Sequence, residues 1–414
     1  MHNEINFGIG FVTGRPNVCK IINSYYKNIL KQGKEINKKI KFTFYILYDL
    51  QYQEAKREEF YQIKPEVYNN KDIEIKYITP EIIEQEKQEI IKKYNIKSVD
   101  IELLLGHGHA KGRNTIMYFA LKQNIDYLLF WDDDEYPVAS ILQENKKIKW
   151  EEQNNISEHI KNIENADVTI GYHCGYISPI PYVELGKDID EDSFRQYIEA
   201  ISNDIISWEN IKNKIQDSNG VTFANPDVIK NKKPEQLKNI GVRNSVAGST
   251  LCLNLRKYKN IPAFYNPVGA RGEDTFFSAN LTQAKVIRVP IYHFHDGFLK
   301  YTTIMDGKYP ETLRKIKPED KKIEYRFYQA SIGWMKYKPL LLYIENKEKY
   351  KQKDKLVRDK LTYSIPKINK LFKTDRFDDV LKAFNMWSSN VEEFYKDFIK
   401  TNKVWEELKR KLKE

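Results

Sequence analysis

Residues 107–137 read HGHAKGRNTIMYFALKQNIDYLLFWDDDEYP, and this stretch decides the fold class of the chain. Apolar residues recur at helical spacing through 112–121, which predicts a helix behind a glycine-containing start. The charge-free run 127–131 then predicts a strand that is buried on both faces of a sheet. Four acidic residues, 132–135, follow at once. We therefore expect a cluster of carboxylates at the carboxyl end of a buried strand, where open α/β sheets bind ligands.

The acidic run 132–135 has two interpretations. An acidic run taken alone is most often a solvated turn. Carboxylates this close repel one another unless a cation joins them. The buried strand before the run and the basic, glycine-rich turn before the helix favour such a cation. The run therefore predicts a metal site.

Residues 109–137 resemble the nucleotide-sugar segment of glycosyltransferases with the GT-A fold, especially the large family-2-like group. In that group an Arg-Asn helix start leads to a hydrophobic strand and an Asp-x-Asp motif. Arg113, with the asparagine after it, and the triplet 132–134 match this pattern. The resemblance implies that Asp132 and Asp134 bind the metal and that Asp132 also contacts the nucleotide, although spacing does not fix which pair of the triplet works. Arg113 is expected at the diphosphate, because a guanidinium near a helix start suits that group.

The first 80 residues alternate between strand and helix patterns. Strands are expected over 5–12, 41–50 and 72–78, with a helix over 21–30 between the first two. This β-α-β succession predicts a parallel or mixed sheet with helices on its faces.

The turn TGRPN, which begins at Thr13, resembles the opening of the GT-A fold, where this turn meets the nucleotide. We expect nucleotide contacts from Thr13, from Arg15 and from Asp49 at the end of the second strand; a plain surface turn is the alternative for Arg15. His109 is expected to contact phosphate or base, although lone histidines are more often structural.

A second match lies at 269–277, which reads GARGEDTFF. Residues 245–253 predict a strand that contains a glycine, and the GT-A pattern continues from such a strand to a Glu-Asp helix start. Acids at a helix start can simply be caps. The resemblance instead assigns acceptor activation to this motif, with Asp274 as the general base of an inverting transfer and Glu273 as the weaker candidate; a retaining mechanism stays open.

A third match lies at 286–298, which reads VIRVPIYHFHDGF. His293 and His295 alternate on the predicted strand and so share one face. In many GT-A enzymes a histidine after the last core strand completes the metal site. His295, nearer the end of the strand, is the first candidate and His293 the second. An imidazole beside carboxylates and phosphate oxygens suits Mn²⁺ better than Ca²⁺; Mg²⁺ is the alternative.

The resemblance covers residues 4–300 and implies an α/β fold of GT-A type, with a mixed central sheet flanked by helices. We divide this domain, 1–300, into a nucleotide-sugar half over 1–137 and an acceptor half over 138–300. The acceptor half contains a long irregular segment, 177–243. Because a long polar insertion in an α/β domain usually carries function, we assign this segment to acceptor recognition.

Within the acceptor half, residues 138–165 predict polar helical structure and residues 166–176 predict a strand. Only 194–211 is convincingly helical inside the insertion.

Residues 301–414 predict a basic helical region outside the resemblance. They hold 28 Lys and Arg against 18 Asp and Glu, a surplus that equals the net charge of +10, whereas residues 1–300 hold 40 of each. Apolar residues recur at three- and four-residue steps over 380–398, as in helices that pack on another surface. We expect a supporting region without chemistry, so that a core lacking it still binds nucleotide sugar. The alternative is a surface for an anionic partner such as a membrane.

The cysteines and the apolar runs indicate the compartment. Cys19, Cys174 and Cys252 show no paired spacing, which favours a reduced compartment and no structural zinc. The first residues lack the pattern of a signal peptide, and no run approaches the ~18 apolar residues of a spanning helix. We expect a cytoplasmic protein, or one bound peripherally to the cytoplasmic face of a membrane.

Together the three matches imply a metal-dependent glycosyltransferase of the hexosyl-transferring type, acting in bacterial glycan or glycoconjugate synthesis. The donor would be a nucleoside-diphosphate sugar and the acceptor a glycan, lipid-linked or protein hydroxyl; no nucleic-acid partner is expected. The Glu-Asp helix start lacks the aromatic pattern of processive polysaccharide synthases, which favours transfer of a single sugar. The base, the sugar, the acceptor, the stereochemistry and the oligomeric state stay open.

Three other functions compete with this one. A sugar-nucleotide pyrophosphorylase is also an α/β, metal-dependent enzyme, but it requires a glycine-rich turn with Arg and Lys directly after the first strand, and TGRPN matches this poorly. A glycoside hydrolase also uses two carboxylates, but it does not need Arg113 or the histidines. A non-catalytic binder of an anionic polymer would use the basic region 301–414.

Overall fold

The computed structural model describes residues 4–36, 38–50, 55–202, 208–212, 220–238 and 246–414. In this part of the chain nine strands form one mixed sheet, in the order β3-β2-β1-β4-β10-β8-β11-β5, with β9 paired to β11. Neighbours are parallel from β3 to β4 and between β8 and β11, while β10 runs antiparallel to both β4 and β8. The strands are β1 (Glu4–Thr13), β2 (Lys39–Tyr48), β3 (Ile73–Ile78), β4 (Tyr127–Phe130), β5 (Glu135–Tyr136), β8 (Val168–Gly175), β9 (Glu235–Gln236), β10 (Leu251–Asn254) and β11 (Val286–His295).

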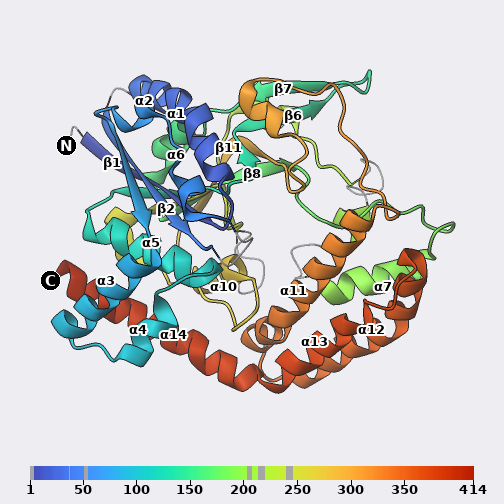
Figure 1. Cartoon of the computed structure of the whole chain (residues 1–414). Coiled ribbons are helices and arrows are strands. Elements are labelled where there is room, and N and C mark those ends of the chain that lie inside the picture. Colours follow the sequence, from blue (N-terminus) through green and yellow to red (C-terminus); the bar gives the residue numbers. More distant parts are fainter. Residues whose placement is uncertain (1–3, 37, 51–54, 203–207, 213–219, 239–245) are drawn as a thin grey trace.

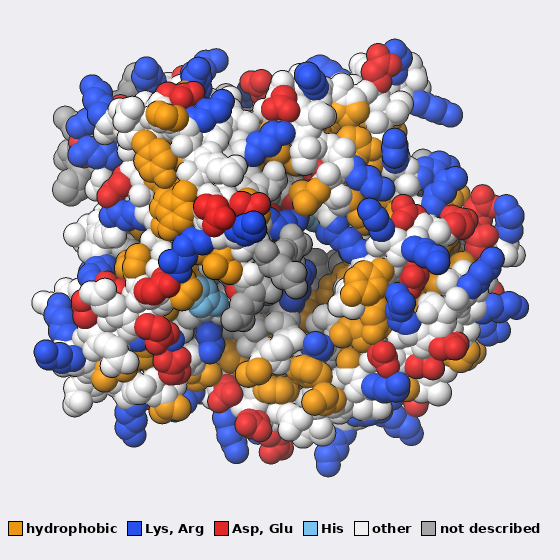
Figure 2. Space-filling view, in the orientation of Figure 1, with side chains coloured by type: hydrophobic (Ala, Val, Ile, Leu, Met, Phe, Trp, Pro, Cys, Tyr) orange, Lys and Arg blue, Asp and Glu red, His pale blue; other side chains and the backbone are white. Residues whose placement is uncertain are grey.

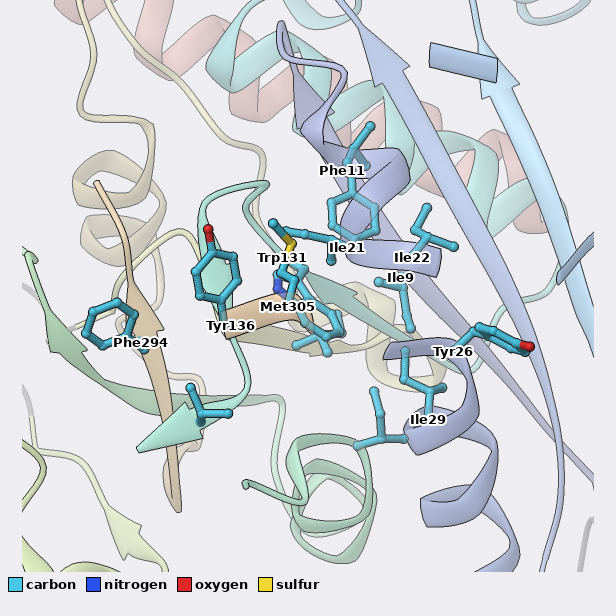
Figure 3. Close-up of a cluster of buried hydrophobic side chains, with 14 of the residues drawn as sticks. Ile9, Phe11, Ile21, Ile22, Tyr26, Ile29, Trp131, Tyr136, Phe294 and Met305 are labelled. Carbon is cyan, nitrogen blue, oxygen red and sulfur yellow. The ribbon is translucent and has the colours of Figure 1, made fainter. Parts of the chain in front are cut away.

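Helices cover both faces of the sheet, and Figure 1 shows this layered arrangement. α1 (Asn17–Glu35) and α6 (Asn155–Ile163) pack with one face of β1 and β4 in the first core cluster. Figure 3 shows part of this cluster, in which Ile9 and Phe11 of β1 lie beside Ile21 and Ile22 of α1. The opposite face packs with the helices α3 (Pro80–Tyr94), α4 (Ser98–Leu104), α5 (His109–Lys122) and α10 (Glu273–Asn280).

β1 has glycine at the positions where α5 comes close. Ile5, Phe7, Ile9 and Phe11 alternate into the first core, as a strand period of two requires. A Cβ at Gly10, on the other face, would lie 3.0 Å from Ile116 of α5. The glycine therefore lets the helix that carries Arg113 lie directly on the sheet.

The C-terminal region is helical, as predicted, and it shares its core with the sheet. α11 (Lys321–Glu345), α12 (Tyr350–Phe372) and α13 (Asp378–Ser389) pack with α7 (Glu191–Ile201) and α8 (Trp208–Ile211) from the segment 177–243. α14 (Val391–Lys413) then runs back beneath the sheet part, as Figure 1 shows. Its Trp405 is buried in the second core and donates a hydrogen bond to the Ile261 carbonyl at 3.0 Å. The region 301–414 is thus not an independent unit.

Three local predictions differ from the structure. Residues 138–165 form a hairpin of β6 (Val138–Leu142) and β7 (Ile148–Glu152) before α6, because a turn in which Lys146 has φ +62° reverses the chain. The helix expected over 194–211 is α7 and α8, with 203–207 outside the described residues. The strand expected over 245–253 is only β10, and 246–250 is irregular.

The remaining short elements connect these layers. They are η1 (Arg57–Tyr61), α2 (Pro65–Tyr68), α9 (Pro226–Asn231), η3 (Leu255–Asn260) and η4 (Thr302–Asp306). Among the described helices, none is both long and apolar enough to cross a membrane. The α/β class, the mixed central sheet flanked by helices and the helical C-terminal region agree with the fold expected from the sequence.

Candidate active site

The predicted site residues gather at one edge of the sheet. β1, β2, β4, β8 and β11 run in the same direction, because β10 is antiparallel to both of its neighbours. Their carboxyl ends therefore meet, and they carry Thr13, Asp49, the triplet 132–134 and His295. Figure 2 shows a hollow near the centre of this view, with acidic and basic side chains on its rim.

The middle acid of the triplet, Asp133, is tied to the turn after β1. Arg15 forms ion pairs with Asp133 and, at 2.9 Å between Nη2 and Oδ2, with Asp134. The Thr13 hydroxyl donates to the Asp133 carboxylate and accepts from the Arg15 backbone N–H at 2.9 Å. Asp133 thus fixes the TGRPN turn against the end of β4 and brings Thr13 and Arg15 beside the acidic triplet.

Asp134 and His295 form the second contact of the triplet. His295 Nε2 lies 3.6 Å from Asp134 Oδ2. Burial alone would lower the pKa of His295, but the Asp134 carboxylate outweighs it and raises this pKa to about 9. Burial likewise opposes ionisation of Asp134, yet His295 and Arg15 hold its pKa below the ordinary value. The two residues form an ion pair at neutral pH.

Arg113 joins the triplet to the Glu-Asp helix start. Its guanidinium lies 3.0 Å from Glu273 Oε1, 3.5 Å from Asp132 Oδ1 and 3.5 Å from the Gly248 carbonyl oxygen. The Arg113 side chain is only 6% exposed, whereas that of Asp132 is 40% exposed. Arg113 therefore holds the two acidic segments together, and this position leaves it less open to a diphosphate than we expected.

Asp274 has the ionisation behaviour of a base that works near neutral pH. Burial, followed by repulsion from Glu273, raises the pKa of Asp274 to about 6. Burial also opposes ionisation of Glu273, but Arg113 and His109 reverse this and lower its pKa. An ion-paired acid of low pKa is a poor proton acceptor, so Asp274 has the pKa that is better suited to accepting a proton.

Gly248 allows Arg113 and Asp274 to approach the same backbone segment. A Cβ at this position would lie 3.0 Å from Arg113 Nη2 and 3.5 Å from Asp274 Cβ. The close approach predicted for this glycine is therefore present, although it lies before β10 rather than inside a strand.

His109 and Asp49 lie at the periphery of these contacts. His109 is the first residue of α5, and the Glu273 carboxylate acts to raise its pKa. Burial and the cations Arg271 and Arg113 outweigh this effect, so the pKa of His109 is lowered. The Asp49 backbone N–H donates to the Thr13 carbonyl at 2.9 Å, which places Asp49 beside the turn after β1.

His293 does not share the position of His295. Its side chain is 1% exposed, and its Nδ1 lies 3.3 Å from Glu135 Oε2 while its Nε2 lies 3.2 Å from Asn155 Nδ2. It packs against the Trp131 ring with centroids 5.2 Å apart. Both ring nitrogens have protein partners, so His293 is enclosed beneath the site and its expected role as a metal ligand finds no support in these contacts.

The described residues do not include a preformed metal site of three or more His, Cys, Asp and Glu side chains. Asp134 and His295 provide two candidate ligands on one side, with the partly exposed Asp132 nearby. Mg²⁺ and similar cations are often held by one or two carboxylates together with substrate phosphates. The residues therefore fit a cation that arrives with a diphosphate.

Sequence reasoning missed two contributions to the site. Glu135, at the end of the acidic run, binds His173 of β8 and Ser249, and these three come together only through the order of the strands and the irregular segment before β10. Arg326 of α11 reaches the segment after β11: a Cβ at Gly297 would lie 2.9 Å from Arg326 Nη2 and 3.0 Å from His295 Cε1. A helix outside the resemblance thus brings a cation near the Asp134–His295 pair.

No family model matches the sequence, and no curated protein matches it. Among solved structures, the chain is similar to apo mouse xyloside xylosyltransferase 1, with 10% identity and a TM-score of 0.24 over 68% of this chain and 74% of that one. A likeness this weak carries no argument, so the architecture rests on the sheet order and the site on its own contacts.

Proposed function

We propose that this protein is a glycosyltransferase that moves a single sugar from a nucleoside-diphosphate donor to an acceptor hydroxyl. The observation that carries the proposal is the meeting of two charged clusters at the carboxyl edge of the sheet. One contains Arg15, Asp134 and His295; the other contains Arg113 and Asp274. The acidic triplet and the Gly248 segment connect them, as a site for a charged leaving group and a proton acceptor requires.

The first cluster suits the diphosphate of the donor. Arg15, at 21% side-chain exposure, can form charge-assisted hydrogen bonds with phosphate oxygens. Asp134 and His295, with Asp132, are the residues that would hold a divalent cation of the Mn²⁺ or Mg²⁺ class. When bound, such a cation neutralises the charge that develops on the leaving diphosphate. Binding it would require His295 to lose the proton that Asp134 stabilises.

The second cluster suits the acceptor. Asp274, partly exposed and with a pKa near 6, would accept the proton of the attacking hydroxyl, while Arg113 holds Glu273 away from this role. A carboxylate base that activates the acceptor hydroxyl in this way would correspond to inversion at the anomeric carbon.

Thermal unfolding in the presence of UDP, GDP, CDP and their sugar conjugates, with and without Mn²⁺, tests the proposal. A ligand at ~100 times its Kd adds ~2.7 kcal/mol of stability, which is readily measured. We expect one nucleotide series to stabilise the protein and the stabilisation to be larger with Mn²⁺. Asp306→Asn, at an exposed ion pair with Lys20, is the matched control. Absence of stabilisation by every nucleotide sugar would refute the proposal.

A further inference from the structure

Two histidines bind the same buried carboxylate beneath the site. The Glu135 side chain is 4% exposed, and its Oε1 accepts a hydrogen bond from Ser249 Oγ at 2.6 Å. His173 Nε2 lies 3.2 Å from the same Oε1 and 3.0 Å from Ser249 Oγ. His293 Nδ1 lies 3.3 Å from the other oxygen, Oε2.

The hydrogen bonds fix which nitrogen of His173 carries the proton. Ser249 donates its single hydroxyl proton to Glu135, so its oxygen can only accept from His173 Nε2. Nε2 therefore carries a hydrogen, and in the neutral ring the other nitrogen, Nδ1, is an acceptor. Within the described part of the chain, Nδ1 of His173 has no hydrogen-bond partner.

Exposure separates the two histidines further. The His173 side chain is 16% exposed, whereas that of His293 is 1% exposed and both of its nitrogens are bonded. The Glu135 carboxylate thus holds His293 inside the core, whereas it orients His173 so that Nδ1 remains available as a hydrogen-bond acceptor. A packing role explains His293 but leaves the free acceptor of His173 without a purpose.

His173 lies between the two charged clusters. Glu135, which orients it, directly follows Asp134 of the diphosphate cluster. Ser249, which also binds it, directly follows Gly248, the residue that Arg113 and Asp274 approach. In a displacement the transferred group must lie between the leaving group and the attacking hydroxyl, and this is the part of the site that His173 borders.

We propose that His173 binds the transferred sugar, with Nδ1 accepting a hydrogen bond from one of its hydroxyl groups and with Glu135 and Ser249 as positioning residues. The inference rests on the proposed glycosyl transfer and adds to it a determinant of donor selectivity. A site built to bond a hydroxyl discriminates strongly against an analogue that lacks it, because the polar group of the protein is then left unpaired. A deoxy sugar at the matching carbon is expected to be a poor donor.

Two substitutions separate the nitrogen atoms of His173. His173→Gln places an amide near the position of Nε2 and removes the group at Nδ1, while His173→Asn keeps a polar group near Nδ1. Calorimetry with Mn²⁺ would compare UDP with UDP-glucose and UDP-N-acetylglucosamine, and GDP with GDP-mannose. We expect His173→Gln to lower the affinity for the sugar conjugate by ~10-fold or more, which is the effect of losing one hydrogen bond in a buried site. The conjugate in question is the one that the unmodified protein binds. The nucleoside diphosphate should bind as in the unmodified protein, and His173→Asn should retain more of the selectivity for the conjugate than His173→Gln does.

The outcomes are distinct. If His173→Gln weakens the nucleoside diphosphate and its conjugate equally, or leaves their ratio unchanged, the residue only supports the fold and this inference is wrong while the proposed function stands. If the unmodified protein binds no nucleotide and no conjugate, both proposals fail. Thermal unfolding of both variants shows whether a loss of binding arises from misfolding. If His173→Gln does not fold, the affinities of His173→Asn for the nucleoside diphosphate and its conjugate decide the question.

Discussion

Replacing Asp274 by asparagine should remove most of the activity and at the same time make the folded protein more stable. Burial and then the Glu273 carboxylate raise the pKa of Asp274 from 3.8 to about 6. At ~1.4 kcal/mol per pKa unit, this shift means that ionised Asp274 costs the folded state roughly 3 kcal/mol. Asparagine removes the charge but keeps an oxygen that can accept from the Thr275 N–H, now 2.8 Å from Asp274. We expect a net gain of ~1–2 kcal/mol near pH 7.

The direction of the pH dependence follows from the raised pKa. Below about pH 3, Asp274 is protonated in the folded state and largely so in the unfolded chain, so the cost is nearly absent. Between about pH 3 and pH 6 the unfolded chain loses this proton first, so the free energy of unfolding falls as the pH rises. Above about pH 6 the full cost is present. The contribution of Asp274 to this fall should be missing in Asp274→Asn.

Activity should rise with pH, whereas the free energy of unfolding falls. A base must be ionised, so kcat/KM should rise with pH through about 6, and Asp274→Asn should lose ~10²–10⁴-fold in kcat while donor affinity is unchanged. Urea unfolding at two pH values measures the stability. Release of the nucleoside diphosphate measures the turnover, and calorimetry measures the affinity for the donor. A variant that is less stable and binds donor weakly would place Asp274 in the helix cap or the donor site. Retention of the anomeric configuration in the product, read by NMR, would also refute the base assignment.

Three further predictions concern other parts of the molecule. Asp134→Asn should abolish the Mn²⁺-dependent part of nucleotide-sugar stabilisation in thermal unfolding, with Asp306→Asn unchanged as control; metal dependence that survives in Asp134→Asn and Asp132→Asn would remove the proposed cation site. Gly248→Ala places a methyl group 3.0 Å from Arg113 Nη2 and should lower kcat/KM by ~10-fold or more, since a shift of a positioning residue by a fraction of an ångström is costly; kinetics equal to the unmodified protein would show that the segment adapts. Trp405→Ala should cost ~3–5 kcal/mol in urea unfolding because the ring is fully buried, and a loss below 1 kcal/mol would contradict the shared core.

The sequence predicted best those parts of the fold for which local pattern and chain order are sufficient. The helix α5, the buried strand β4 and the acids after it follow one another without interruption, so periodicity alone locates them. Their meeting with Thr13 and Arg15 followed from the rule that parallel strands end at the same edge. The start of α10 at Glu273 was predicted for the same reason: its signal is local.

The parts that sequence missed depend on distances that no local pattern records. β5 has only two residues, too few for any periodicity, yet it brings Glu135 beside His295 of β11. The contact of Glu135 with His173 and Ser249 needs β10 to be inserted antiparallel between β4 and β8. The alternation of His293 and His295 indicated that they share a face of the strand, but it did not indicate how deeply each side chain is buried. His293 is enclosed, whereas His295 reaches Asp134.

The C-terminal region helps to shape the site, and this changes how an enzyme can be distinguished from a binder of anionic polymers. Gly272, with φ +96°, precedes Glu273, and a Cβ there would lie 2.8 Å from the Tyr337 ring of α11. Deleting 301–414 would remove the Tyr337 ring that packs against Gly272 and also Trp405 from the second core. The truncated chain would then lose its affinity for either ligand, whichever function is right. Reversing the charge of exposed lysines on α12, such as Lys351 and Lys355, leaves these contacts in place. A polymer binder should then lose its salt-dependent affinity, whereas an enzyme should keep its turnover, because the cations near the Asp134–His295 pair are different residues.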